Sequence, residues 1–174
     1  MDEHAADLLA DERLTAMGLL VETHAGVRGL VEADLARHDV PGSTFDVLIR
    51  LARSPGGRLP MTELAIQSTL SNSGLTRVVD RLLAAGCVER VRDRDDRRVW
   101  WAVLTPKGLD RVLAVLPDHL ATIDASLTSV LDPEELRAFT AALRKIRAVV
   151  KPGADPANAP QLEAAASGDG RASA

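Results

Sequence analysis

The stretch from residue 71 to 108 constrains the fold most, because its apolar periodicity changes twice within a short distance. It begins with Ser-Asn-Ser at 71–73, three side chains suited to capping the start of a helix. Apolar residues then recur at three- and four-residue spacing up to Gly86, a pattern typical of an amphipathic helix that ends in a left-handed cap. Two runs rich in Val and Trp follow, 87–92 and 98–104, with a polar connection between them. This order predicts a helix, a β-hairpin and then a second helix opened by a Thr-Pro pair.

Arginines are concentrated on this region, although the chain as a whole has a net charge of −4. Residues 50–98 contain ten arginines against six acidic residues, a local excess of positive charge. Arg77 and Arg81 fall on the predicted outer face of the helix, and Arg94 and Arg97 at the hairpin tip. This arrangement fits a protein that places one element in a DNA groove and a second on the adjacent backbone. The alternative is a solvated helix followed by an ordinary hairpin, since charge runs usually face water.

Several separated blocks stand in order along the same region: T-R-V-V-D-R-L at 76–82, Gly86, Arg90, D-R-R at 96–98 and L-T-P-K-G at 104–108. Together they closely resemble the winged helix-turn-helix signature of the MarR family of bacterial transcriptional regulators. A weaker resemblance extends over the helical flanks, from residue 10 to residue 150. It implies a mainly α fold with a small β-hairpin wing (α+β), which dimerises through its N- and C-terminal helices.

The resemblance implies that the partner is double-stranded DNA with a near-palindromic operator. On the predicted recognition helix, Arg77 suits the O6/N7 edge of guanine, and Gly74 would let the backbone approach the duplex closely. The wing arginines would enter the minor groove, where the negative potential attracts them. The predicted DNA-contacting residues are Ser71, Ser73, Gly74, Thr76, Arg77, Arg81, Arg94 and Arg97.

Three further charged residues are expected to hold the wing rather than to touch DNA. The resemblance implies that Asp80, on the recognition helix, forms an ion pair with Arg98 on the wing. Asp96 is an unfavourable neighbour for a phosphate, so a role in holding the wing fits it better. The alternative for Asp80 and Arg98 is that they are two unrelated surface charges.

The chain divides into four predicted segments that differ in apolar pattern and composition. Ser43 and Thr62 are expected to cap the two short helices that precede the recognition helix. A short run at 58–60 is similar to the family's third strand, which pairs with the wing. The segments are an N-terminal dimerisation helix (1–40), the DNA-binding lobe (41–108), C-terminal dimerisation helices (109–151) and a disordered tail (152–174).

The first long helix, from about Asp11 to Arg37, is apolar over a wide arc and therefore needs cover on more than one side. Burial within the subunit or against a second copy would both supply this cover, and the resemblance favours a homodimer. A last helix begins at Asp132-Pro133, a strong start with an N-cap and proline at the first helical position. In the family, the first and last helices together build the dimer.

His24 and Arg28 lie one turn apart on the same face of the first long helix, in line with apolar residues. By resemblance this helix borders the family's effector cleft, where such a polar pair could bind an aromatic carboxylate. The alternative is an internal hydrogen bond or a dimer contact. The function predicted for the chain is therefore a transcriptional repressor released from DNA by a small-molecule effector.

Enzymatic function is not expected, because the sequence contains no nucleophile elbow, phosphate loop, dinucleotide turn or paired carboxylates. No cofactor is predicted. The four histidines are scattered with no Cys/His cluster at metal-ligand spacing, so no metal site is predicted within the chain, although one between subunits remains open. The single cysteine, Cys87, is expected to be a buried and unreactive thiol.

The sequence carries no signal peptide and no apolar run long enough to span a membrane, so a cytoplasmic, nucleoid-associated protein is expected. Two other functions stay open. One is a winged-helix protein-interaction module that does not read DNA, against which the outward Arg77 and the arginine-rich hairpin argue. The other is a metal- or redox-responsive regulator of the same fold, which the scattered histidines and the position of Cys87 disfavour.

Overall fold

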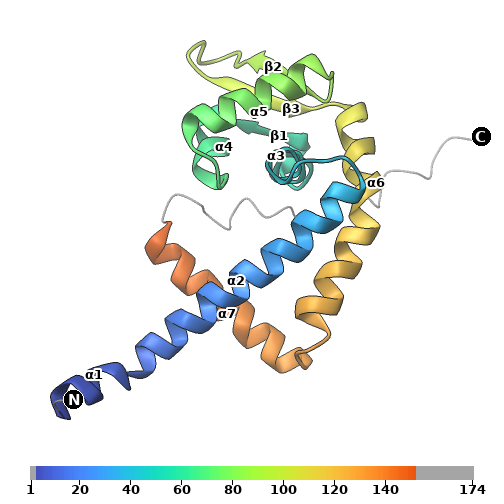
Figure 1. The fold of residues 1–174 in the computed structure, drawn as a ribbon. Coiled ribbons are helices and arrows are strands. Elements are labelled where there is room, and N and C mark those ends of the chain that lie inside the picture. Colours follow the sequence, from blue (N-terminus) through green and yellow to red (C-terminus); the bar gives the residue numbers. More distant parts are fainter. Residues whose placement is uncertain (1–2, 152–174) are drawn as a thin grey trace, which may run out of the picture.

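The computed structural model describes residues 3–151, so the predicted tail at 152–174 lies outside the described residues. Most of this chain is helical and surrounds one small sheet (Figure 1). The elements in order are α1 (Glu3–Leu9), α2 (Glu12–Arg37), α3 (Gly42–Ala52), the 3-10 turn η1 (Pro55–Gly57), β1 (Arg58–Pro60), α4 (Met61–Gln67), α5 (Asn72–Ala84), β2 (Val88–Arg92), β3 (Trp100–Leu104), α6 (Pro106–Ile123), the π-helical turn η2 (Asp124–Thr128) and α7 (Pro133–Val150).

Helices α3, α4 and α5 gather with the sheet into one lobe, which we call the winged-helix lobe (residues 42–104), and the long helices extend away from it (Figure 1). Helix α2 reaches the lobe with its C-terminal end, where it packs against α3 and α6. Helix α6 begins after the wing and runs away from the sheet, packed against α3 and α2. It ends at Ile123, and η2 then turns the chain into α7.

The sheet has three antiparallel strands in the order β1-β3-β2. The long hairpin pairs Val88 with Leu104 at its base and Arg92 with Trp100 near its tip. Strand β1 adds to the outer side of β3, with Leu59 opposite Ala102. The predicted third strand at 58–60 is therefore confirmed, and residues 93–99 form the tip of the wing.

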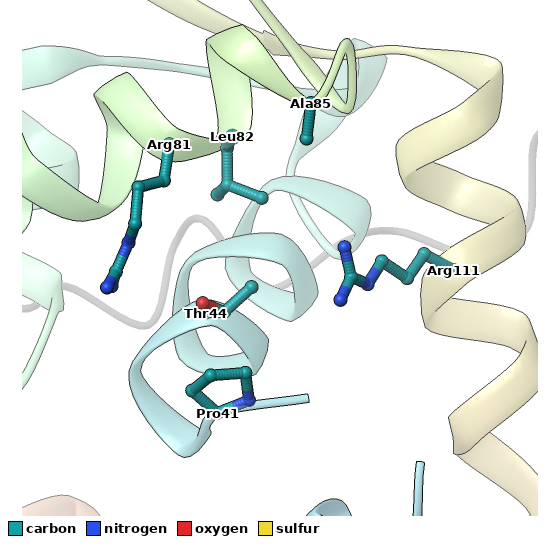
Figure 2. A pocket seen from close by; sticks show the side chains of 6 residues that line it. All are labelled: Pro41, Thr44, Arg81, Leu82, Ala85 and Arg111. Atoms are coloured by element: carbon teal, nitrogen blue, oxygen red, sulfur yellow. The ribbon is translucent and has the colours of Figure 1, made fainter. Parts of the chain in front are cut away.

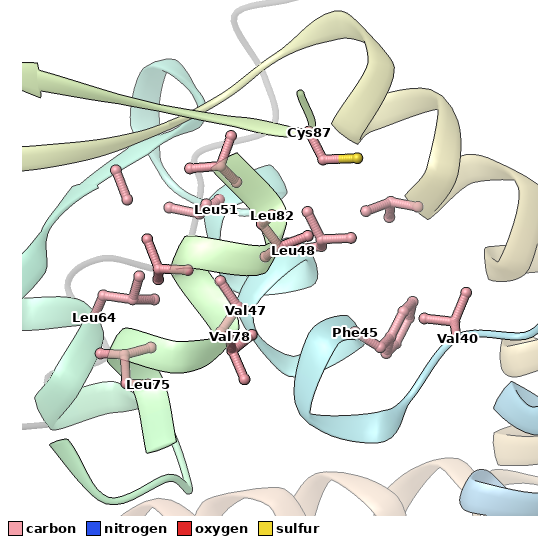
Figure 3. Close-up of a cluster of buried hydrophobic side chains, with 14 of the residues drawn as sticks. Val40, Phe45, Val47, Leu48, Leu51, Leu64, Leu75, Val78, Leu82 and Cys87 are labelled. Carbon is pink, nitrogen blue, oxygen red and sulfur yellow. The ribbon is translucent and has the colours of Figure 1, made fainter. Parts of the chain in front are cut away.

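The core of the lobe lies where α3, α4 and α5 meet under the sheet (Figure 3). The alternating three- and four-residue spacing of α5 predicts its buried face correctly, since Leu75, Val78 and Leu82 are at most 3 % exposed. Cys87 is 1 % exposed, so its predicted burial is confirmed. The other labelled core side chains in Figure 3 are Val40, Phe45, Val47, Leu48, Leu51 and Leu64.

Prolines, not the predicted hydroxyl residues, occupy the N-cap positions of the two short helices. The N-cap of α3 is Pro41 and that of α4 is Pro60, so the expectations for Ser43 and Thr62 are wrong. Pro60 is still paired with β3 as the last residue of β1, and the strand therefore fixes where the chain turns into α4. Extended proline backbone directly before a helix suits this position because its φ is already fixed.

The corner between the wing and α6 is held by close backbone contact. The Thr105 hydroxyl donates to the Gly86 carbonyl (2.8 Å) and accepts from the Gly108 amide (3.1 Å), which caps α6. A Cβ at position 108 would lie 2.1 Å from the Cys87 carbonyl oxygen, so only glycine fits there. The wing and α6 therefore meet at a fixed junction.

A membrane span would need a helix longer and more apolar than any found between residues 3 and 151.

Candidate nucleic-acid interface

Helix α5 follows α4 after a tight turn and presents a polar face away from the core. Ser73, Thr76, Arg77 and Asp80 are exposed on this face. The guanidinium of Arg77 forms no hydrogen bond or ion pair with any other residue between 3 and 151. Five N–H donors on a rigid helix thus remain available to a partner.

The first turn of α5 uses its small polar side chains to order its own backbone. The Ser71 hydroxyl accepts from the Gly74 amide (3.2 Å) and lies 3.4 Å from the Ser73 hydroxyl. Thr76 donates its hydroxyl to the Asn72 carbonyl (3.0 Å). A Cβ at Gly74 would approach the Ser71 hydroxyl to 3.1 Å, so the glycine also makes room for the helix cap. The close approach to DNA predicted for Gly74 stays a prediction.

Asp93 orders the tip of the wing, a role that the sequence reasoning missed. One of its carboxylate oxygens accepts from the amides of Asp95 (2.9 Å) and Asp96 (3.0 Å), and the other accepts from the Trp101 indole N–H (2.7 Å). These hydrogen bonds, the one from the Asp96 amide first, hold the pKa of Asp93 below its ordinary value. An aspartate at the start of a short polar run is the usual signal of such an Asx turn.

The predicted ion pair between Asp80 and Arg98 is wrong for the described chain. The Arg98 guanidinium pairs with Asp96 instead, with Nε 3.1 Å from Oδ1 and Nη2 3.1 Å from Oδ2. Asp96 also accepts from the Arg98 amide (3.0 Å), so the two residues close a local turn at the wing tip. A partner two residues away requires much less ordering of the chain than one on another element. The interactions of Asp96 agree with its predicted role in holding the wing.

The exposed arginines of the wing extend beyond the two predicted at its tip. Arg94 and Arg97 are exposed, as a contact with DNA requires. On β2, the guanidinium groups of Arg92 and Arg90 lie 4.9 and 5.5 Å from the ring centroid of Trp100. Stacking on an aromatic ring orients these side chains, which the sequence reasoning did not select as DNA contacts. The alternation of Arg90 and Arg92 along one strand face, opposite an aromatic residue, could have identified them.

Arg81 lies at the edge of α5 that faces α3 and lines a hollow of about 190 Å³. Figure 2 shows Arg81 and Arg111 extending toward this hollow from α5 and α6, on either side of Thr44. Arg111 also donates to the Asp39 carbonyl (3.3 Å) in the turn between α2 and α3. The remaining lining residues are Pro41, Leu82 and Ala85.

His24 and Arg28, the predicted effector-binding residues, are exposed on α2 and do not line this hollow. The Arg28 guanidinium pairs with Glu32 one turn further along the helix (2.8 Å). Such an exposed pair contributes little stability. Effector binding by His24 and Arg28 stays a prediction.

A helix-turn-helix, a three-stranded wing and exposed arginines on both elements define a winged helix-turn-helix DNA-binding protein. Comparison with known proteins agrees with this class, because residues 38–99 match the sequence model of the MarR family. The chain is therefore similar to MarR family regulators, and its fold and exposed arginines are those of a DNA-binding transcriptional regulator.

Three relatives illustrate the similarity. The HTH-type transcriptional regulator MhqR of Bacillus subtilis is 27 % identical over 138 residues, which cover 79 % of this chain and 93 % of MhqR. The MarR family regulator AbsC of Streptomyces coelicolor superposes with a TM-score of 0.74 at 29 % identity, over 82 % of this chain and 97 % of AbsC. A second MarR family regulator from Streptomyces coelicolor, solved in complex with DNA, gives a TM-score of 0.73 at 27 % identity, over 81 % of this chain and 89 % of that regulator.

Proposed function

We propose that this regulator is a homodimeric repressor that reads a near-palindromic operator with α5 and grips the adjacent backbone and minor groove with its wing. The observation that carries the proposal is the placement of exposed arginines on two adjoining rigid elements: Arg77 on α5, and Arg94 and Arg97 at the wing tip. Arginine on a helix can read a guanine edge in the major groove, whereas arginines on a wing suit the negative potential of the minor groove.

The homodimer is supported by apolar side chains that are exposed to solvent in a single chain. Helix α2 exposes Leu14, Met17 and Val21 at 56–59 %, and α7 exposes Ile146 at 47 %. Helix α7 has no buried residue in the single chain, although apolar residues follow one of its faces. A second copy that covers both helices would remove this surface from water, at about 25 cal/mol for each Å² of apolar surface.

The test is selection of bound duplexes from a random DNA pool with the purified protein, followed by footprinting of the selected site. Two half-sites in inverted orientation, about one helical turn apart, are expected for two α5 helices in successive major grooves. Selection of no common sequence would contradict sequence reading. It would favour a protein-interaction module that has kept the fold.

We propose further that an anionic small molecule releases the repressor from DNA. The effector must bind the arrangement that cannot hold DNA better than the one that can, since equal affinity for both shifts nothing. Two positions are supported by different observations: the exposed pair His24 and Arg28 on α2, and the hollow that Arg81 and Arg111 help to line. The hollow touches the recognition helix directly, so a ligand there would act on α5 itself.

His24→Ala and Arg28→Ala test the position on α2, and Arg111→Ala tests the hollow. Each variant is first checked for unchanged operator affinity. The variant that loses release by the effector identifies the pocket. If all three variants are released like the wild type, neither position binds the effector.

Because MhqR and the other relatives are regulators, we also infer that the chain has no catalytic activity and acts in the cytoplasm, at the DNA that it regulates.

A further inference from the structure

Two acidic and two histidine side chains meet where α2 packs against α6, outside the DNA-binding surface. Asp34 lies in the last turn of α2, His38 is the C-cap residue of that helix, and Asp118 and His119 are neighbours on α6. Potential ligand atoms of Asp34, His38 and Asp118 all lie within 4.8 Å of one another. His38 Nε2 and Asp118 Oδ2 are 2.9 Å apart, and their contact bridges the two helices. The sequence reasoning missed this cluster because the pair at 34 and 38 lies 80 or more positions before the pair at 118 and 119.

Asp34 is fully buried, and its carboxylate is only half satisfied. Arg37 binds the Oδ1 atom from the solvent side, whereas Oδ2 has no hydrogen-bond partner among the described residues. The Nδ1 atom of His119 is also buried without a hydrogen-bond partner, 3.9 Å from this Oδ2. A buried polar atom without a partner is costly, and such atoms in native proteins commonly bind an ion or a water molecule.

We propose that Asp34, His38 and Asp118 bind a divalent metal ion of the zinc class, with His119 positioning the Asp34 carboxylate. An imidazole nitrogen and carboxylate oxygens suit zinc, whereas magnesium and calcium prefer all-oxygen sites. The side chain of Asp118 is 57 % exposed and that of His38 24 %, so the ion can enter from solvent and keep a water molecule as its fourth ligand. His119 packs edge-on against Phe45, which fixes its ring beside Asp34.

An ion in this position ties α2 to α6. Helix α6 starts at the rigid corner where Gly108 contacts the Cys87 carbonyl, and α2 carries much of the exposed apolar surface. The ion therefore fixes the angle between these two helices and stabilises the folded chain by mass action. The proposal does not rest on the function proposed above, since it concerns binding of the metal by the protein alone.

The test uses the full chain without an affinity tag, freed of metal by a chelator. Titration with zinc is expected to show one ion per chain and a rise of the melting temperature, and cobalt should give the strong visible absorption of a four-coordinate site. His38→Gln and Asp118→Asn each remove a partly exposed ligand and should lower the affinity by at least about 100-fold. His24→Gln removes an exposed histidine from the same helix and should leave the affinity unchanged.

His119→Phe keeps the ring against Phe45 but removes the nitrogen beside Asp34. A positioning role predicts a loss of affinity of about 10- to 100-fold and a shift of the cobalt bands, with the melting temperature of the metal-free chain nearly unchanged. The proposal is overturned if the wild type binds no zinc, or if His38→Gln and Asp118→Asn bind it as tightly as the wild type. A direct Nδ1–H to Oδ2 hydrogen bond in the metal-free chain that persists after zinc is added would likewise overturn it.

Discussion

Arg77 and the wing arginines have the same side chain but different tasks in the proposed complex. Arg77→Ala should weaken operator binding by roughly 1–3 kcal/mol and relax the preference at one position of each half-site. Arg94→Ala or Arg97→Ala should instead weaken binding to all sequences and reduce the salt dependence by about one unit for each phosphate that is no longer neutralised. Binding titrations against operator and random duplexes at several salt concentrations separate the two effects. Equal losses on both duplexes for all three variants would contradict the assignment of α5 as the reading element.

The contribution of Gly108 to stability can be tested by one substitution, because the corner between the wing and α6 leaves no room for a side chain at this position. Gly108→Ala should lower the free energy of unfolding by roughly 1–3 kcal/mol, because the new methyl group would meet the Cys87 carbonyl. Asp110→Ala, on an exposed position of the same helix, should change it by less than about 0.5 kcal/mol. Urea denaturation measures both, and an unchanged Gly108→Ala variant would show that the corner is more open than described.

At the scale of the element, the order of the wing depends on the charge of Asp93. Its pKa lies below the ordinary 3.8 in the folded chain because its carboxylate accepts from the Asp96 amide, the Trp101 indole and the Asp95 amide. The carboxylate therefore stabilises the tip fully above its unfolded pKa, and this contribution is lost as the pH falls through the folded pKa. The Trp101 indole N–H resonance should shift as the solution is acidified below this range. Asp93→Asn leaves no titrating group hydrogen-bonded to the Trp101 indole, so this shift should be absent, and a shift of the same size would disprove the link.

At the scale of the whole molecule, the exposed apolar faces of α2 and α7 predict a dimer. Sedimentation at micromolar concentration should give twice the mass of one chain, because large apolar interfaces are characteristic of permanent homodimers. Met17→Asp places a charge among the exposed apolar side chains of α2 and should shift the equilibrium toward the monomer. Asp110→Ala serves again as the control. A monomeric wild type would contradict both the dimer and the paired half-sites.

The local sequence was sufficient for the recognition helix, its cap at Ser71, the hairpin and the capped start of α7, where Asp132 and Glu135 form a capping box. These features depend on residues within one or two turns of one another, and periodicity and capping describe such interactions directly. The third strand, β1, is only three residues long and was expected from family resemblance alone. Pattern could not establish it, because so short a run carries no periodicity.

Tertiary structure decided everything that depends on partners far apart in the sequence. Asp93 accepts from the Trp101 indole N–H at 2.7 Å across the hairpin. The distant pair predicted between Asp80 and Arg98 does not form, because Arg98 pairs with the nearby Asp96. The cluster of Asp34 and His119 arises from the packing of α2 on α6, which no spacing along the chain reveals. Sequence thus determined the elements and their buried faces, since these follow from local backbone geometry. The long-range pairs of charged and polar groups were set by packing, because many partners compete for each group and only the folded shape selects among them.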